Sequence, residues 1–249
     1  MSEQLRVASE SMEPEIFGTL QGEGRHTGEP ATFLRLSECN LQCSWCDTPY
    51  TWNFDGTPYK HDDDVKYSRV DQQIKLTVGE AINQITQEQT RRLVISGGEP
   101  MLQQDTIADL IKGLKNEDPS FKVDIETNGT VVPTDEMVEL VDLFTVSPKL
   151  ASSGNAQHKR EKPKALQRFA ELDNADFKFV ITEQTDIEDV LRYQSDYEIK
   201  PDKIWLMPEG RTKEQLDRHS QQVAELAMEY GFNLTGRLHI DLWGDKRGV

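Results

Sequence analysis

The sequence predicts an α/β protein in which parallel strands form a sheet curled towards a partial barrel of six strand–helix units. Three observations predict this fold class. Short apolar runs typical of buried strands alternate with amphipathic helical segments, and polar or turn residues follow the strand-like runs. The chain also holds about two units fewer than a complete eight-unit barrel needs. A doubly wound sheet is the alternative arrangement of the same units.

The strands are expected at short apolar runs bounded by polar or turn residues. These runs cover residues 32–37, 93–96, 123–127, 144–147, 177–181 and 204–207. A last strand is expected over residues 234–243, within a C-terminal strand and tail that span residues 234–249. Because ligands bind at the carboxyl ends of parallel strands, the residues that follow these runs are the first candidates for a binding site.

The helices are expected where apolar residues recur every three or four positions. Thr77-Val-Gly-Glu80 is typical of a capping box and begins the first such segment. A longer segment is expected to end at Gly231, since glycine commonly follows the last helical turn. The apolar faces consist of Ala81, Ile82 and Ile85; Ile107, Leu110, Ile111 and Leu114; Met137, Leu140 and Val141; and Leu216, Val223, Leu226 and Ala227.

Length and charge favour one domain over residues 1–249 of a soluble cytoplasmic protein. The net charge of −16 argues against nonspecific binding to nucleic acid, which depends on clustered Lys and Arg. Residues 1–14 lack the apolar core of a signal peptide, and no apolar run reaches the length of a membrane span.

Residues 51–76 interrupt the alternation of strands and helices. The segment is polar, has no clear period, and carries three consecutive aspartates at positions 62–64. It is expected to be a surface insertion. A run of acidic residues is usually a solvated face, so these aspartates are not expected to bind a metal ion.

The only three cysteines of the chain, Cys39, Cys43 and Cys46, form a C-x3-C-x2-C loop. Three thiolates can hold three irons of a four-iron cluster and leave the fourth iron open to a small molecule. Zinc bound with His26 or His61 is an alternative, but neither histidine stands at zinc-finger spacing. A disulfide is not favoured, because the number of cysteines is odd and nothing indicates an oxidising compartment.

Three predicted strands end in groups that suit a polar ligand. Ser96-Gly-Gly-Glu-Pro100 follows the second strand, and its glycines let backbone amides approach a ligand closely. Glu126-Thr-Asn-Gly-Thr130 and Ser147-Pro-Lys149 end the next two strands. Each motif alone is typical of a turn, but together, after a three-cysteine loop, they indicate one site.

The cysteine loop with an aromatic residue before its last cysteine, followed by Gly-Gly-Glu-Pro, resembles the radical S-adenosylmethionine superfamily. The resemblance implies a [4Fe-4S] cluster whose open iron chelates the methionine part of S-adenosylmethionine. It also implies that the reduced cluster cleaves the cofactor to a 5′-deoxyadenosyl radical. The protein then supplies binding and orientation.

A narrower resemblance covers nearly the whole chain, with residues 51–76 as its weakest part. The motifs lie at residues 17–24, 33–35, 46–48, 125–130, 146–149 and 238–244. They are similar to those of the 7-carboxy-7-deazaguanine synthase family. The resemblance implies a lyase that converts 6-carboxy-5,6,7,8-tetrahydropterin into 7-carboxy-7-deazaguanine, with release of ammonia, on the route to queuosine and other 7-deazapurines. It also implies Mg²⁺, a homodimer, and a flavodoxin- or ferredoxin-like electron donor.

The resemblance assigns roles by position. Cys39, Cys43 and Cys46 would hold the cluster, and the hydroxyl of Thr48 would bind Mg²⁺. The substrate would contact Leu20, Gln21, Gly22, Glu23, Arg35 and Ser96. S-adenosylmethionine would contact Trp45, Cys46, Asp47, Gly98, Glu126, Ser147, Pro148, Lys149, Met207, Pro208 and Glu209.

Arg35 suits the pterin carboxylate because its guanidinium can bind a carboxylate through two hydrogen bonds. A surface ion pair is the alternative for Arg35. His239 is expected to be a hydrogen-bonding residue rather than a ligand, although the tail could cap the pocket. Trp52 and Trp205 are expected to pack in the protein interior. Two other functions remain open: an activase that installs a glycyl radical on a partner enzyme, and a non-catalytic zinc-binding module.

Overall fold

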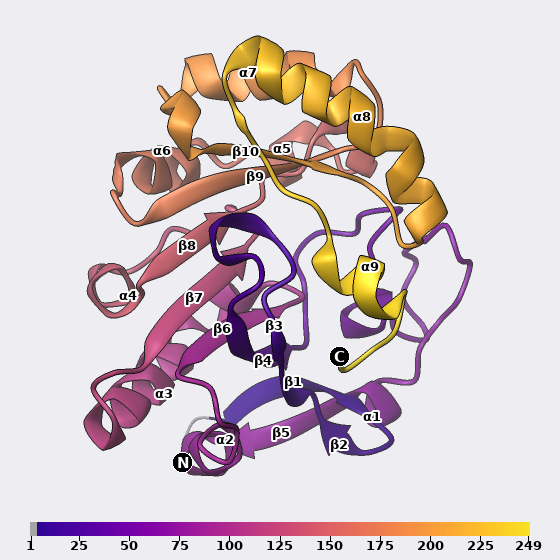
Figure 1. Cartoon of the computed structure of the whole chain (residues 1–249). Helices are drawn as coiled ribbons and strands as arrows, with labels where there is room; N and C mark the ends of the chain where they lie inside the picture. The colour runs from indigo at the N-terminus through magenta and orange to yellow at the C-terminus, as the bar shows by residue number, and fades with distance from the viewer. Residues whose placement is uncertain (1–3) are drawn as a thin grey trace.

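The computed structural model describes residues 4–249, which form an eleven-stranded mixed sheet with helices along its outer face (Figure 1). The strands are β1 (Gln4–Glu10), β2 (Glu13–Pro14), β3 (Ile16–Leu20), β4 (Pro30–Leu36), β5 (Gln73–Thr77), β6 (Arg92–Gly97), β7 (Lys122–Thr127), β8 (Leu143–Val146), β9 (Ala175–Ile181), β10 (Ile204–Pro208) and β11 (Asn233–Leu234).

The larger part of the sheet is parallel and follows the order β4-β6-β7-β8-β9-β10-β11. The six runs predicted as its strands all lie in this part, from β4 to β10. Parallel neighbours need a crossover, and each of the six crossovers contains at least one α-helix. The predicted α/β class with a mostly parallel sheet is confirmed.

Antiparallel strands extend the sheet beyond β4. Strand β1 pairs with β2, β4 and β5, and β3 pairs with β4. The sequence did not indicate these strands, because β1 lies in a polar segment and β5 lies inside the predicted insertion. Their pairing is decided by contacts between distant parts of the chain, such as Leu5 opposite Leu76, which are both buried.

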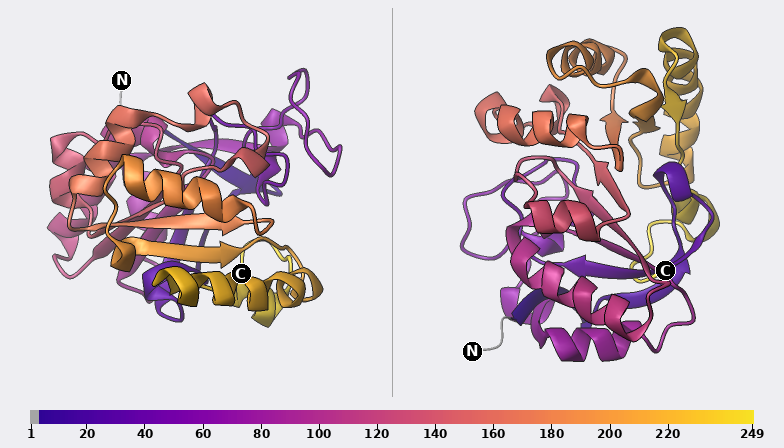
Figure 2. Two further views of the ribbon diagram at one scale, coloured as in Figure 1. Left: turned by 90° about the horizontal axis from the view of Figure 1, so that it is seen from above. Right: turned by 90° about the vertical axis from the view of Figure 1, so that its left-hand side faces the viewer.

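Most helices lie on one face of the sheet, whereas α9 and the C-terminal residues lie against the other (Figures 1 and 2). The α-helices are α1 (Arg69–Gln72), α2 (Val78–Ile85), α3 (Gln104–Glu117), α4 (Asp135–Leu140), α5 (Gln157–Arg160), α6 (Pro163–Glu171), α7 (Asp186–Asp196), α8 (Lys213–Tyr230) and α9 (Leu238–Trp243). Short 3-10 helices are η1 (Gly24–His26), η2 (Pro49–Thr51), η3 (Pro100–Gln103), η4 (Ala151–Ser153) and η5 (Pro201–Lys203).

Local signals set several helix ends as predicted. Thr77 and Glu80 form both hydrogen bonds of a capping box at the start of α2. Helix α8 is followed directly by Gly231, whose φ of 70° lies in the left-handed region that favours glycine at a helix C-terminus. The predicted apolar face of α3 is buried: Ile107, Leu110, Ile111 and Leu114 are fully covered by the sheet and its neighbours. Burial of such a face supplies most of the stability of a helix of this length.

The prediction of a surface insertion over residues 51–76 is wrong at the C-terminal end of the segment. The rest of the segment is only partly exposed. Residues 73–77 belong to the sheet as β5. Trp52, Phe54 and His61 are buried, because the loop folds back over the cysteine loop and packs its few apolar groups beneath it. The three aspartates at positions 62–64 are exposed, and only Asp63 forms an ion pair with an arginine within the described residues.

The strand predicted over residues 234–243 is also wrong. Strand β11 ends at Leu234 after two parallel pairs with β10. The chain then turns over the cavity, where the backbone N–H of Leu238 donates to the carbonyl of Gly22 at 2.9 Å. Helix α9 follows. The strand does not continue because the charged side chain of Arg237 pairs with Glu23 and Asp47 above the sheet. A strand that continued along β10 would carry Arg237 away from these partners.

Among residues 4–249, none of the helices combines the length and apolar character needed to cross a lipid bilayer.

Candidate active site

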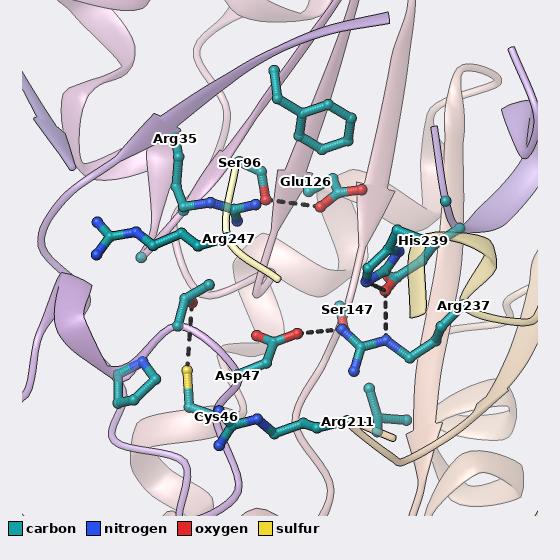
Figure 3. A pocket seen from close by; sticks show the side chains of 18 of the residues that line it. Arg35, Cys46, Asp47, Ser96, Glu126, Ser147, Arg211, Arg237, His239 and Arg247 are labelled. Atoms are coloured by element: carbon teal, nitrogen blue, oxygen red, sulfur yellow. Dashed lines mark hydrogen bonds and ion pairs between the residues drawn. The ribbon is translucent and has the colours of Figure 1, made fainter. Parts of the chain in front are cut away.

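A cavity of about 460 Å³ opens at the carboxyl ends of the parallel strands, as the fold class predicts. The cysteine loop after β4 forms one side of it. The ends of β6 to β10 form its floor, while the Gln21–Glu23 turn, α9 and the C-terminal residues close it from above. Residues more than two hundred positions apart therefore face one space (Figure 3).

The three cysteine thiols line this cavity, and each sulfur accepts a hydrogen bond from an N–H group. The donors are the backbone of Leu41 to Cys39 at 3.4 Å, the Asn155 amide to Cys43 at 3.3 Å, and the Trp52 indole to Cys46 at 3.3 Å. N–H donors of this kind stabilise the electron-rich sulfurs of a thiolate-bound cluster and tune its potential. The loop therefore fits an iron–sulfur cluster.

Burial works against free thiolates in this loop. It raises the pKa of the Cys43 thiol to about 12, although the nearby Lys149 charge lowers that pKa in part. Burial also raises the pKa of Cys39 and of Cys46. Metal coordination deprotonates such thiols.

The Gly-Gly-Glu-Pro turn fixes the floor of the cavity against the cysteine loop. A Cβ on Gly98 would lie 2.0 Å from the carbonyl oxygen of Glu38, so only glycine fits there. Glu99 is fully buried and accepts hydrogen bonds from Thr127 Oγ1 at 2.7 Å and from the Asn128 backbone at 2.7 Å. Glu99 thus joins the ends of β6 and β7, which is a structural role.

Arg35 projects from β4 into the cavity, and the carboxylate of Glu15 lies next to its Nε atom. Its Nε lies 3.6 Å from Glu15 Oε2 without a hydrogen bond, and its guanidinium forms no hydrogen bond within residues 4–249. Burial alone would lower the pKa of Arg35, but Tyr50 and Glu15 raise it, so the side chain keeps its charge. Its guanidinium remains free for an anion in the cavity.

Next to Arg35 in the cavity lie Ser96 at the end of β6 and Glu126 at the end of β7 (Figure 3). Ser96 Oγ donates to Glu126 Oε2 at 2.8 Å, and the Gln21 amide donates to Glu126 Oε1 at 3.3 Å. This group offers both donors and acceptors to a ligand, as the edge of a polar heterocycle needs.

Glu23 is the centre of a buried ionic network above the sheet. Its carboxylate pairs with Lys178 and, at 2.9 Å, with Nε of Arg237, and His239 lies 4.0 Å away. Burial alone would raise the pKa of Glu23, but the charges of Lys178 and Arg237 outweigh it and hold that pKa well below its usual range. The guanidinium of Arg237 also pairs with Asp47, which follows the last cysteine.

The C-terminal residues close the cavity near Arg35. Arg247 Nε pairs with Glu15 Oε1 at 2.5 Å, and its guanidinium lies 3.6 Å from the ring centre of Tyr50. Farther along the rim, Arg211 Nη1 pairs with Asp63 at 2.7 Å and Arg211 Nη2 pairs with Asp245 at 2.8 Å. Ion pairs therefore hold the tail to the first strands and to the loop after the cysteines.

A family model described as a 4Fe-4S single cluster domain matches residues 20–170. A 7-carboxy-7-deazaguanine synthase of Pyrobaculum aerophilum is 32% identical over 94% of this chain and 95% of its own length. One from Halobacterium salinarum is 32% identical over 93% and 90%.

The chain belongs to the 7-carboxy-7-deazaguanine synthase family.

The solved structure of QueE from Escherichia coli is similar to this family member over 95% of each chain, with a TM-score of 0.69 and 27% sequence identity. The motif order in the sequence predicts this same family.

As a member of the 7-carboxy-7-deazaguanine synthase family, the chain brings nearly all of its predicted site residues to one cavity. Its walls include Leu20, Gln21, Gly22, Glu23, Arg35, Cys39, Cys43, Trp45, Cys46, Asp47, Thr48, Ser96, Gly98, Glu126, Ser147, Lys149, Met207 and Glu209. Pro148 and Pro208 do not line it. His239, expected to be a hydrogen-bonding residue, does line it.

Sequence reasoning missed five cations of the cavity: Lys178, Arg211, Arg237, Lys246 and Arg247. The sequence contains a signal for one of them, Lys178. Lys178 lies in the run Phe177-Lys-Phe-Val-Ile181, where a charge within a buried strand indicates a buried partner. The arginines lie in loops and in the tail, and their partners are distant in sequence.

Proposed function

We propose that this chain is a radical S-adenosylmethionine lyase that converts 6-carboxy-5,6,7,8-tetrahydropterin into 7-carboxy-7-deazaguanine with release of ammonia, in the biosynthesis of queuosine and other 7-deazapurines. The observation that carries the proposal is one cavity with three cysteine thiols on one wall and the free guanidinium of Arg35 on another. The names of the relatives support it.

The cysteine wall would hold the cofactors. Cys39, Cys43 and Cys46 would bind a [4Fe-4S] cluster, which with S-adenosylmethionine supplies the one-electron chemistry that starts the reaction. S-adenosylmethionine would contact the neighbouring strand ends, where Lys149 Nζ already donates to Ser147 Oγ at 2.9 Å. The other contacts proposed for it are Trp45, Asp47, Gly98, Glu126, Pro148, Met207, Pro208 and Glu209. The two prolines would act through the backbone, since they do not line the cavity.

The opposite wall would hold the substrate. The guanidinium of Arg35 would bind the pterin carboxylate, while Gln21 and Ser96 would orient the ring together with Leu20, Gly22 and Glu23. The carboxylate of Glu23 stays ionised at neutral pH, because Lys178 and Arg237 keep its pKa low. It would therefore accept hydrogen bonds from ring N–H groups and would not act as an acid.

Mg²⁺ would bind at Thr48. This buried hydroxyl lies 3.6 Å from Cys46 Sγ, on the cavity wall between the cysteines and Tyr50. A hard cation with one protein hydroxyl would take its other ligands from water and a substrate carboxylate.

We further infer that residues 1–249 form a single radical S-adenosylmethionine domain and that the parallel strands act as a partial (β/α)6 barrel. The open side of this barrel would be covered by α9 and the tail. The protein would work in the cytoplasm as a homodimer, with a flavodoxin- or ferredoxin-like protein as its electron donor.

The test is an anaerobic assay of protein with a reconstituted cluster, using dithionite, S-adenosylmethionine, Mg²⁺ and 6-carboxytetrahydropterin, read by mass spectrometry. Formation of 7-carboxy-7-deazaguanine supports the proposal. 5′-Deoxyadenosine without that product would retain the radical chemistry and refute the substrate. An intact cluster with neither product would favour the glycyl-radical activase.

A further inference from the structure

A basic segment stands out in this acidic chain, and it lies next to the cysteine loop. Residues 156–168 contain five Lys or Arg and one Glu, a net charge of +4, whereas the whole chain carries −16. The segment covers α5 and the first part of α6.

Three lysines of this segment are exposed and unneutralised. Lys159, Lys162 and Lys164 lie at the surface, and none of them forms an ion pair within the described residues. Arg160 differs, because it is buried and donates to the carbonyl of Lys149 at 2.9 Å. Like charges placed together without partners repel one another, and a bound anionic partner would relieve that repulsion.

Several lysines elsewhere in the described residues have acidic partners. Lys112, Lys115 and Lys122 each pair with a carboxylate within 3.1 Å, and Lys178 pairs with Glu23. Lys159, Lys162 and Lys164 differ from these residues, because together they place positive charge without acidic partners on one segment of an acidic chain.

The residues just before α5 hold the cysteine loop in place. The carbonyl of Ser153 accepts from the backbone N–H of Ser44 at 3.1 Å. Asn155 accepts from the backbone N–H of Gln42 at 2.9 Å and donates to Cys43 Sγ at 3.3 Å. Asn155 precedes the first residue of α5 by two positions, so a short length of chain separates the lysines from the Cys43 sulfur.

We propose that Lys159, Lys162 and Lys164 form the docking surface for an acidic one-electron carrier protein, of the flavin or iron–sulfur class, which reduces the cluster from the Cys43 side. The inference rests on the proposed function, which requires a reduced cluster. In each encounter the carrier loses one electron and the cluster gains it, and no bond or proton needs to move. Steering by complementary charge would raise the rate of encounter.

The experiment uses full-length protein with a reconstituted cluster and a reduced flavodoxin as the probe. The test variant carries Lys159→Glu, Lys162→Glu and Lys164→Glu. The control carries Lys75→Glu, Lys200→Glu and Arg218→Glu, which change the net charge by the same amount at exposed sites on other elements. Cluster reduction is followed by stopped-flow absorbance without substrate, so the result does not depend on the identity of the product.

In the test variant, the second-order rate constant for cluster reduction by flavodoxin should fall by roughly tenfold or more. A fall of this size lies within the range expected for loss of electrostatic steering. The control should keep that rate, and both variants should keep their rate with dithionite. The flavodoxin rate of the wild type should fall with added salt more steeply than that of the test variant.

An equal loss in both variants, or no loss in the test variant, would overturn the proposal. The proposal would also be overturned if the test variant kept its rate with flavodoxin but no longer bound RNA in a gel-shift assay. The lysines would then form a nucleic-acid-binding surface. A normal rate of cluster reduction without any 7-carboxy-7-deazaguanine would refute the proposed function and leave the docking surface standing.

Discussion

Replacement of Arg237 by Lys should reduce formation of the product more than it reduces cleavage of S-adenosylmethionine. The guanidinium of Arg237 donates from Nε to Glu23 at 2.9 Å, from Nη1 to the carbonyl of Gly210 at 2.7 Å, and from Nη2 to Asp47. Glu23 is proposed to contact the substrate and Asp47 the cofactor. Arg237 is thus a positioning residue that fixes the distance between the two carboxylates.

The size of the effect follows from the hydrogen bonds that lysine cannot form. Lysine keeps the positive charge but presents one ammonium at a single point, so it cannot reach all three partners of Arg237. A hydrogen bond to a charged group contributes about 1.5–3 kcal/mol, which is roughly a 10- to 150-fold change in kcat/KM if one such bond is absent from the transition state. Glu23 keeps Lys178 as a partner, so the fold should survive.

The assay measures 7-carboxy-7-deazaguanine and 5′-deoxyadenosine in the same reaction. We expect kcat/KM for the pterin to fall by that factor, and 5′-deoxyadenosine to accumulate in excess of product, because cleavage then occurs with a misplaced substrate. The control is Arg218→Lys on α8, where the arginine is exposed and, among residues 4–249, pairs only with Glu214 one turn away. If Arg237→Lys keeps both kcat/KM and the product ratio of the wild type, Arg237 has no positioning role.

Three further predictions concern the rim of the cavity and the cysteine loop. Arg247→Met should raise the KM for the pterin with little change in kcat, because Glu15 would lose its closer partner and draw Arg35 away from the substrate; a change in kcat alone would contradict this reason. Trp52→Phe removes the indole N–H from the last cysteine sulfur and should make the cluster potential more negative, as measured by a redox titration followed by EPR; an unchanged potential would show that this hydrogen bond does not reach the cluster. Thr48→Ala should keep the visible absorbance of the cluster and weaken the response of turnover to Mg²⁺, so an unchanged Mg²⁺ dependence would remove this hydroxyl from its proposed role.

The parts of the fold that local signals decide were predictable from the sequence. The parallel strands are apolar runs, the start of α2 carries its capping box, and the end of α8 carries Gly231. Such features depend on residues close in sequence. The predicted site residues meet because parallel strands bring their carboxyl ends to the same edge.

The remaining features depend on pairings between distant residues, which no local pattern contains. Glu23 and Arg237 are 214 positions apart, and neither residue alone indicates the other. Helix α9 replaces the predicted strand because the buried charges of these two residues hold the chain above the sheet. The sequence allowed the tail to cap the pocket, but the contact that holds it there was missed for the same reason, since Arg247 meets Glu15 only in the folded chain.

The close approach of Gly98 to Glu38 has a practical consequence for mutants of this enzyme. A larger residue at position 98 would push on the backbone directly before Cys39, and that backbone cannot yield without moving the first cysteine. Substitutions in this turn should therefore show first as low iron content. Such a protein would leave the purification column pale where the wild type is brown, so its defect would be visible before any substrate is added.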